Sequence, residues 1–139
     1  MKYAWIFVLG VILIMSSCYK EKYWLDDNAD WTGAYYPVIQ RVTADPSSAA
    51  VGDTVTVTVK YWSLDEVDRI ELYHNASGDE ELYSSTPFED HFSVEENVQV
   101  LPLTYIVPAE AAGKKVTLRV AVVTKKDVEK TASTTVTVE

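Results

Sequence analysis

The stretch TVTVTVKYW, residues Thr54–Trp62, alternates apolar and polar side chains without a break. Side chains of a β-strand point alternately to the two faces of a sheet, so every second residue shares a surface. One face carries only apolar or aromatic residues: Val55, Val57, Val59 and Tyr61. The other face carries Thr54, Thr56, Thr58, Lys60 and Trp62. This alternation predicts a strand with one buried face and one face toward water.

Two other stretches repeat the pattern. Residues 116–124 (VTLRVAVVT) place Val116, Leu118, Val120 and Val122 on one face, and residues 132–138 (ASTTVTV) do the same with Val136 and Val138. We expect further strands at 38–44, 68–74, 81–84 and 98–107, separated by turn signals such as Gly52-Asp53 and Ala112-Gly113. Short strands at regular spacing are typical of an all-β sandwich.

The beginning of the chain has the composition of an export signal. Lys2 is followed by the apolar run 6–15 (IFVLGVILIM), then by the small residues Ser16-Ser17 and by Cys18, the only cysteine. The order Met15-Ser16-Ser17-Cys18 resembles the lipobox of bacterial lipoproteins. The resemblance implies that residues 1–17 are a signal peptide that is removed, and that Cys18 is lipidated and anchors the protein in a membrane.

Two alternatives to a lipoprotein remain open. An uncleaved membrane anchor needs about 20 apolar residues, and this run is shorter. Ordinary secretion would leave Cys18 as an unpaired thiol in an oxidising compartment. The lipoprotein interpretation explains both features, and more than one acyl chain would make the anchoring persistent.

Residues 18–37 differ from the rest and are interpreted as a tether. They show no sustained period and are acidic in part, yet they are rich in aromatics: Tyr19, Tyr23, Trp24, Trp31, Tyr35 and Tyr36. These rings either pack on the folded domain or the membrane interface, or they bind a partner. We therefore expect three parts: a signal peptide over 1–17, a tether over 18–37 and one domain over 38–139.

The domain sequence resembles the immunoglobulin-like domains of Bacteroidetes surface lipoproteins. The resemblance rests on AAVGD (49–53) leading into TVTVTV, on LTYIVPAEAAGKKVTLRVAVVTKKD (103–127) and on TASTTVTV (131–138). It implies a single antiparallel immunoglobulin-like sandwich of about seven strands. The turn Asp127-Val128-Glu129-Lys130 lacks the glycine usual in that family, so we expect a longer or irregular hairpin there.

The same resemblance places the protein at the bacterial cell envelope, at the outer membrane. Lipoproteins of that phylum often carry an acidic export signal after the cysteine, and Tyr19-Lys20-Glu21-Lys22 is not acidic. Whether the protein faces outward or toward the periplasm therefore stays open. The formal net charge is −9, from 12 Lys and Arg against 21 Asp and Glu. Such a surface repels phosphate backbones, so nucleic acid is not an expected partner.

Catalytic signatures are absent from the sequence, and we predict no enzyme, no cofactor and no metal site. His74 and His91 are the only histidines, and both are expected to be surface residues of a strand or loop. Asp26, Asn28 and Asp30 alternate like calcium ligands. However, Trp31 and Pro37 stand where an EF-hand needs glycine and glutamate.

A non-catalytic binding or accessory module is the function class that remains. Its partner would be a glycan or a protein, and the candidate binding aromatics are Trp31, Trp62 and Tyr73. Trp62 is the strongest candidate because the alternation places it opposite the valine face. A structural subunit that pairs through open sheet edges is an alternative. A protease inhibitor is less favoured, because the recognition loops of chagasin-like inhibitors are missing.

Overall fold

The computed structural model describes residues 33–139, and Tyr35–Glu139 form one compact unit. The predicted signal peptide, the lipidated Cys18 and the candidate residue Trp31 lie outside the described residues. Within the described part, no helix is long and apolar enough to cross a membrane. All of the strands described belong to the unit that begins at Tyr35.

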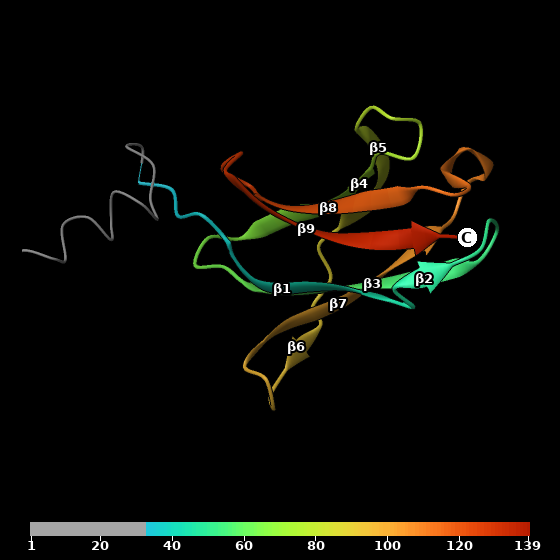
Figure 1. Cartoon of the computed structure of the whole chain (residues 1–139). Coiled ribbons are helices and arrows are strands. Elements are labelled where there is room, and N and C mark those ends of the chain that lie inside the picture. Colours follow the sequence, from blue (N-terminus) through green and yellow to red (C-terminus); the bar gives the residue numbers. More distant parts are fainter. Residues whose placement is uncertain (1–32) are drawn as a thin grey trace, which may run out of the picture. The chain divides into compact units, whose positions relative to one another are not determined.

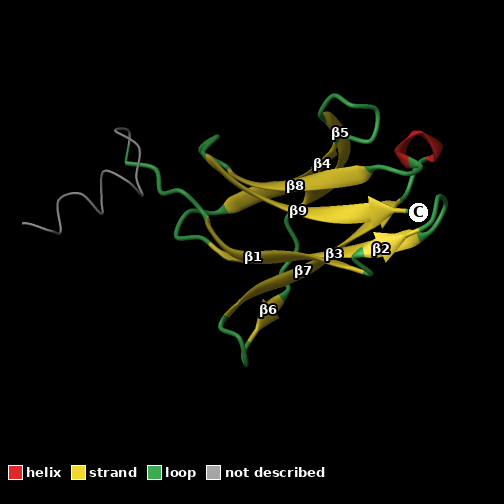
Figure 2. Ribbon diagram, viewed as in Figure 1, coloured by secondary structure: helices red, strands yellow, loops and turns green. Residues whose placement is uncertain are grey.

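The unit is an all-β sandwich of two sheets (Figures 1 and 2). The first sheet has the strand order β1-β3-β7-β6, and the second has the order β2-β9-β8-β4-β5. The strands are β1 (Val38–Asp45), β2 (Ser48–Ala49), β3 (Thr54–Trp62), β4 (Val67–His74), β5 (Glu81–Pro87), β6 (Phe92–Ser93), β7 (Val98–Ile106), β8 (Lys115–Thr124) and β9 (Glu129–Val138). One short 3-10 turn, Ala109–Ala111, lies between β7 and β8.

The alternating residues of β3 bury the face that the sequence predicts. Val55, Val57 and Val59 are fully buried, whereas Thr56 and Trp62 are exposed. β3 is the centre of its sheet, since it pairs antiparallel with β1 on one side and with β7 on the other. Its valine face therefore packs across the sandwich and forms the middle of the core.

β8 supplies the other half of the core. Leu118, Val120 and Val122 point into the sandwich and are fully buried, as the sequence predicts. Ala121 and Val123, on the opposite face, are also buried. β8 is flanked by β4 and β9, so its outward residues are covered by side chains of neighbouring strands. β8 thus carries buried residues on both of its faces.

The fold differs from the sequence-based expectation in two short strands. β2 forms where the chain leaves β1 through the cis Asp45–Pro46 bond and crosses to pair in parallel with β9. β6 pairs with the start of β7 through only two residues. Neither has enough residues to show a period, which is why the sequence indicated about seven strands and not nine.

The hairpin between β8 and β9 is short and regular, so the expected long or irregular turn was wrong. The Thr124 amide donates to the Val128 carbonyl at 2.9 Å, and the Asp127 amide donates to the Thr124 carbonyl at 3.0 Å. Asp127 has a φ of 59°, which is the left-handed conformation that glycine usually provides. Aspartate is among the few residues that tolerate this conformation, so it replaces the missing glycine.

One side of the sandwich is left open between β5 and β7, but the β7 edge is largely blunted. The outward amide of Val100 donates to the His91 carbonyl at 3.0 Å, and the outward amide of Ile106 donates to the Tyr83 hydroxyl at 2.9 Å. Pro102 lies between them and has no amide hydrogen to offer. Such edges resist pairing with a further strand.

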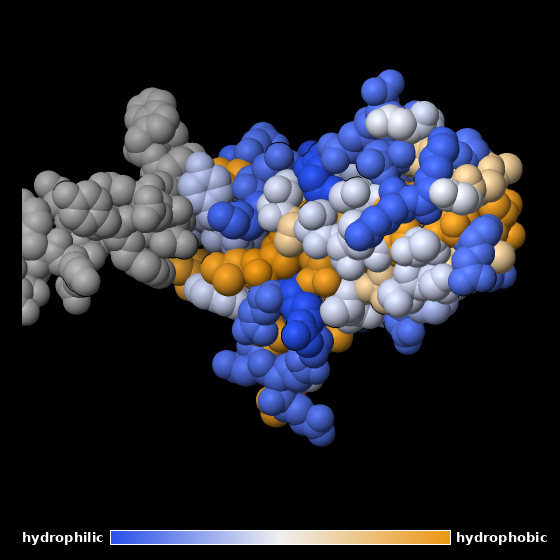
Figure 3. Space-filling view, in the orientation of Figure 1, coloured by the Kyte–Doolittle hydropathy of each residue, from blue (hydrophilic) through white to orange (hydrophobic). Residues whose placement is uncertain are grey.

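Surface polarity varies along the molecule. Figure 3 shows a mostly polar face with an apolar band where β9 and β1 come together. Figure 1 shows β6 and its flanking loops projecting from the β7 side of the first sheet, away from the second sheet. We call residues 88–97 (FEDHFSVEEN) the β6 arm.

Candidate functional site

Exposed apolar side chains gather at one end of the sandwich. Among the described residues, nine large hydrophobic side chains are exposed, and five of them belong to the end of β3, the β3–β4 loop and the β6 arm. These five are Val94 (85% exposed), Leu64 (62%), Phe92 (50%), Trp62 (37%) and Phe88 (37%). Clustered apolar exposure of this kind marks interaction surfaces, whereas scattered single residues need no explanation.

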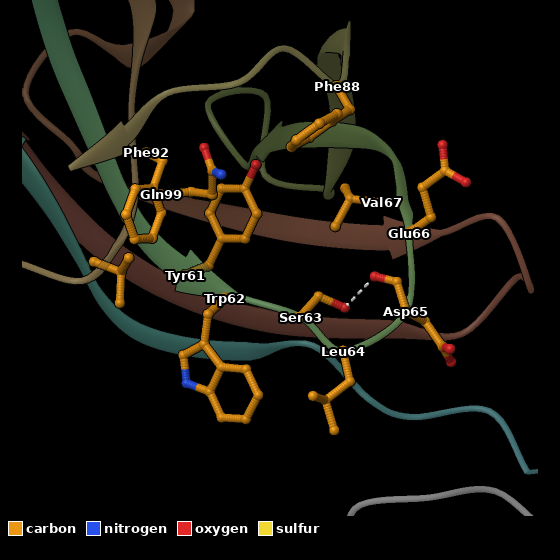
Figure 4. A pocket seen from close by; sticks show the side chains of 11 residues that line it. Tyr61, Trp62, Ser63, Leu64, Asp65, Glu66, Val67, Phe88, Phe92 and Gln99 are labelled. Atoms are coloured by element: carbon orange, nitrogen blue, oxygen red, sulfur yellow. Dashed lines mark hydrogen bonds between the residues drawn. The ribbon is translucent and has the colours of Figure 1, made fainter. Parts of the chain in front are cut away.

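Four of these five residues line a pocket of about 380 Å³, which we call the Trp62 pocket. It is formed by the end of β3, the β3–β4 loop, the β6 arm and the start of β7, and Figure 4 shows its side chains. Trp62 and Leu64 lie on one side of the β3 end, and the Tyr61 ring lies on the other. The lining residues are Tyr61, Trp62, Ser63, Leu64, Asp65, Glu66, Val67, Phe88, Phe92, Val98 and Gln99.

Tyr61 provides a polar group at the base of the pocket. Its side chain is only 1% exposed, and its hydroxyl is directed into the space between Phe92 and Phe88 (Figure 4). None of the residues described makes a hydrogen bond to that hydroxyl. Burial, followed by the negative charge of Asp90, raises the pKa of Tyr61 to about 12. The hydroxyl therefore stays protonated at physiological pH and can donate to a ligand.

The other polar side chains of this wall bond to one another. The Gln99 amide nitrogen donates to Asp90 at 2.9 Å, and the Gln99 oxygen accepts from the His91 amide at 2.7 Å. Ser63 donates its hydroxyl hydrogen to the Asp65 carbonyl at 2.7 Å, as drawn in Figure 4. These bonds hold the β6 arm against β7 and shape the β3–β4 loop. They leave the pocket surface predominantly apolar.

The β3–β4 loop is held from two further directions. Asp65 forms an ion pair with Lys126 at 2.8 Å and accepts a hydrogen bond from the Tyr35 amide at 2.7 Å. Glu66 pairs with Lys125 on the same β8–β9 hairpin. The Glu66–Lys125 pair is exposed, and exposed ion pairs contribute little stability individually, so its role here is positional. These contacts fix the loop that carries Leu64 beside Trp62.

Tyr73 lies on a different surface and is not brought together with Trp62. It is on β4, on the outer face of the second sheet, within a set of polar side chains that we call the Tyr73 network: Arg69, Glu71, Tyr73, Glu80 and Arg119. The Tyr73 hydroxyl donates to Glu71 at 2.6 Å, and Arg69 donates to Glu71 at 2.7 Å. The guanidinium of Arg119 lies 4.1 Å from the centre of the Tyr73 ring.

The Tyr73 network shifts the acidity of its central carboxylate. The hydrogen bond from Tyr73, followed by that from Arg69, holds the pKa of Glu71 below its ordinary value of 4.5. Arg119 in turn donates to both oxygens of Glu80. The ring and the hydroxyl of Tyr73 are thus engaged within the protein, which makes Tyr73 a poorer binding candidate than Trp62.

The two histidines occupy different environments. His91 is exposed in the β6 arm, as expected. His74 is the last residue of β4 and is half-buried. It lies 3.3 Å from the Tyr105 hydroxyl and meets the rings of Tyr83 and Tyr105 edge to face. The His74, Tyr83 and Tyr105 rings contact one another, and no sequence pattern marked this group, because its members come from three strands. Over residues 33–139, no three His, Cys, Asp or Glu side chains are grouped to hold a metal ion.

Comparisons with known proteins identify the fold and nothing finer. No protein-family model matches the chain, and no curated protein matches its sequence. Among solved structures, a superoxide reductase (neelaredoxin) from Ignicoccus hospitalis is similar at 16% identity and a TM-score of 0.53, over 76% of this chain and 81% of that one. A putative superoxide reductase from Thermotoga maritima has 14% identity and a TM-score of 0.51, over 83% and 97% of the two chains.

A third similar structure is Spo0M, a sporulation control protein from Bacillus subtilis, with 14% identity and a TM-score of 0.51. The match covers 74% of this chain and 49% of that one. Identities this low indicate a shared β-sandwich architecture, which unrelated functions use. The function must therefore be argued from the site.

Proposed function

We propose that this protein is a non-catalytic binding module of the bacterial cell envelope, anchored in the outer membrane by lipid on Cys18. The Trp62 pocket is its binding site, and the partner is a protein. The lipobox-like order at Cys18 and the resemblance to Bacteroidetes surface lipoproteins support the anchoring and the location. The clustered exposure of Trp62, Leu64, Phe88 and Phe92 is the observation that carries the binding role.

A protein partner fits the pocket better than a glycan does. Sugar sites combine an aromatic face with several free hydrogen-bonding groups that replace water around the hydroxyls. In the Trp62 pocket, Gln99 and Ser63 already bond within the protein, and Tyr61 supplies one hydroxyl that makes no hydrogen bond to any residue of 33–139. An apolar or aromatic side chain of a partner needs just such an apolar cavity with few polar groups.

The anchoring is tested on the protein from its own membrane fraction. Mass spectrometry is expected to find an acylated Cys18 and no residues 1–17. Cys18→Ala should release the protein from the membrane or mislocalise it. An intact Met1 on the mature protein would contradict the lipoprotein part of the proposal.

The binding role is tested by photo-crosslinking in the intact cell. A photoreactive phenylalanine analogue in place of Phe92 is expected to give a discrete protein adduct. Trp62→Ala should abolish the adduct, whereas the matched control Leu82→Ala should not, because Leu82 is an exposed apolar residue on β5 outside the pocket. A carbohydrate adduct would reassign the site to glycans, and an adduct that survives Trp62→Ala would reject it.

A further inference from the structure

The β6 arm combines exposed apolar side chains with a strong negative charge. Residues 88–97 contain four carboxylates, Glu89, Asp90, Glu95 and Glu96, and no lysine or arginine. Phe88, Phe92 and Val94 alternate with them along the same ten residues. Figure 3 shows the projecting arm as mainly polar, with isolated apolar patches. An apolar anchor site and an acidic rim are therefore built into one short segment.

Within residues 33–139, one lysine and one histidine lie close to these four carboxylates. Glu96 pairs with Lys60 on β3. Among residues 33–139, the His91 ring nitrogen at 3.8 Å is the only ion-pair partner of Glu89, and Asp90 accepts hydrogen bonds from Gln99 and from the Phe92 amide, which are uncharged. The lysines of the β8–β9 hairpin are paired with Asp65 and Glu66 on the other side of the pocket. The pocket rim formed by the arm thus keeps an excess of carboxylates.

Resting on the proposed function, we infer that the Trp62 pocket and the β6 arm together dock a cationic segment of a partner protein. An apolar or aromatic side chain of that segment enters the pocket at the end of β3. Phe88 and Phe92 lie on the Tyr61 side of this strand end, and Trp62 lies on its other side. Lysine or arginine side chains on either side of it face Glu89, Asp90 and Glu95. The apolar contact provides the affinity, while the charges speed association and select the partner.

Charge also disfavours the other occupants of this surface. Anionic lipid headgroups and phosphates are repelled by the arm. Each chain has a formal net charge of −9, so a second copy of the chain would be repelled. Residues 19–32 of the chain itself contain aromatics, but their two lysines are outnumbered by four carboxylates. A cationic segment is the occupant for which both the pocket and its rim are complementary.

The test uses the full chain in a non-ionic detergent and three labelled peptides of equal length. Each peptide carries one central tryptophan, and the flanking residues give net charges of +4, 0 and −4. Fluorescence anisotropy at low salt is expected to rank the affinities in that order, with the +4 peptide bound at least tenfold more tightly than the −4 peptide. Added salt should lower the affinity for the +4 peptide more than for the other two peptides, because salt screens exposed charges.

Two matched pairs of charge substitutions separate a local effect from the overall charge. The double variant Glu89→Gln, Glu95→Gln should lower the affinity for the +4 peptide on the order of fivefold. Its affinity for the neutral peptide should be unchanged. Asp79→Asn with Glu110→Gln removes the same charge from the opposite end of the sandwich and should have a much smaller effect. Equal affinity for the +4 and neutral peptides, or equal effects of the two pairs, would overturn the inference.

The remaining outcomes are also decisive. Binding that Trp62→Ala leaves intact would reject the pocket, and with it the proposed function. Absence of peptide binding together with a Trp62-dependent protein adduct in cells would overturn only the cationic segment. Binding to phosphatidylglycerol vesicles, self-association in light scattering, or peptide binding that appears only when residues 19–32 are deleted would assign the surface to a different occupant.

Discussion

Trp62 and Tyr73 are both aromatic strand residues whose side chains point away from the core, yet their surroundings differ. Tyr73 lies near the end of β4 but is flanked by β8 on one side and β5 on the other, and there Arg119 covers its ring and Glu71 accepts from its hydroxyl. Trp62 lies at the last position of β3, where the sheet ends and loops replace neighbouring strands. Its ring lines a pocket with other exposed apolar residues. Availability for binding thus depends on what the adjacent strands supply.

The comparison separates stabilising residues from exposed residues of similar chemistry. In the centre of a sheet, each outward side chain has neighbours on two strands and finds partners among them. At the end of a strand, those neighbours are loops, and the side chain stays accessible. Substitutions in the β4/β8 centre and at the Trp62 end should therefore differ in their effects on stability and on binding.

The largest expected loss of stability comes from the core beneath the Tyr73 network. Val120→Ala removes two methyl groups from a fully buried position of β8 and leaves a cavity. We expect a loss of ~1–3 kcal/mol in the free energy of unfolding, measured by chemical denaturation. Val57→Ala on β3 should behave in the same way. Thr56→Ala is the control on the opposite face of β3, and an equal effect there would contradict the assignment of the faces.

A smaller loss is expected from the centre of the Tyr73 network. The Glu71 side chain is 12% exposed and accepts from Arg69 and Tyr73. Glu71→Ala leaves both donors without this acceptor, and we expect a loss of about 1–2 kcal/mol at neutral pH. Glu80→Gln, in the exposed part of the same network, should cost less because water replaces the pair. If Glu71→Ala leaves the free energy of unfolding unchanged, the bond to Glu71 does not hold Tyr73 in place. Tyr73 would then again be a candidate binding residue.

The pH dependence of stability depends on the same residue. Because the pKa of Glu71 is lowered in the folded state, its contribution is fully present above the ordinary value of 4.5. It is lost as the pH falls below that value through the folded pKa. The difference in stability between the wild-type protein and Glu71→Ala should therefore shrink on acidification below pH 4.5. Denaturation curves recorded from about pH 7 downward measure it, and a constant difference would contradict the assigned shift.

The sequence predicts the regular parts of this fold because period-two patterns report burial directly. The bounds of β3 and the inward faces of β8 and β9 were confirmed, as was the outward position of Trp62. The pattern cannot report contacts between distant segments. The cover of Tyr73 by Arg119 depends on sheet order and loop path, and so does the presence of Trp62, Phe88 and Phe92 in the lining of one pocket. Asp127 shows a third limit, since a left-handed turn there does not require glycine.

The smallest effect on stability is expected at the tip of the β6 arm, although its effect on binding should be large. Val94 is 85% exposed, so Val94→Ala should change the free energy of unfolding by less than about 0.5 kcal/mol. Phe92 is 50% exposed, and Phe92→Ala should cost less than Val120→Ala does. Both variants should lower the affinity for the +4 peptide. Phe92→Ala should have the larger effect, because Phe92 lines the pocket. If Val94→Ala instead destabilised the fold as much as a core substitution, the arm would be part of the packed structure. Its apolar residues would then not form a docking surface, and the contrast between the two regions would fail.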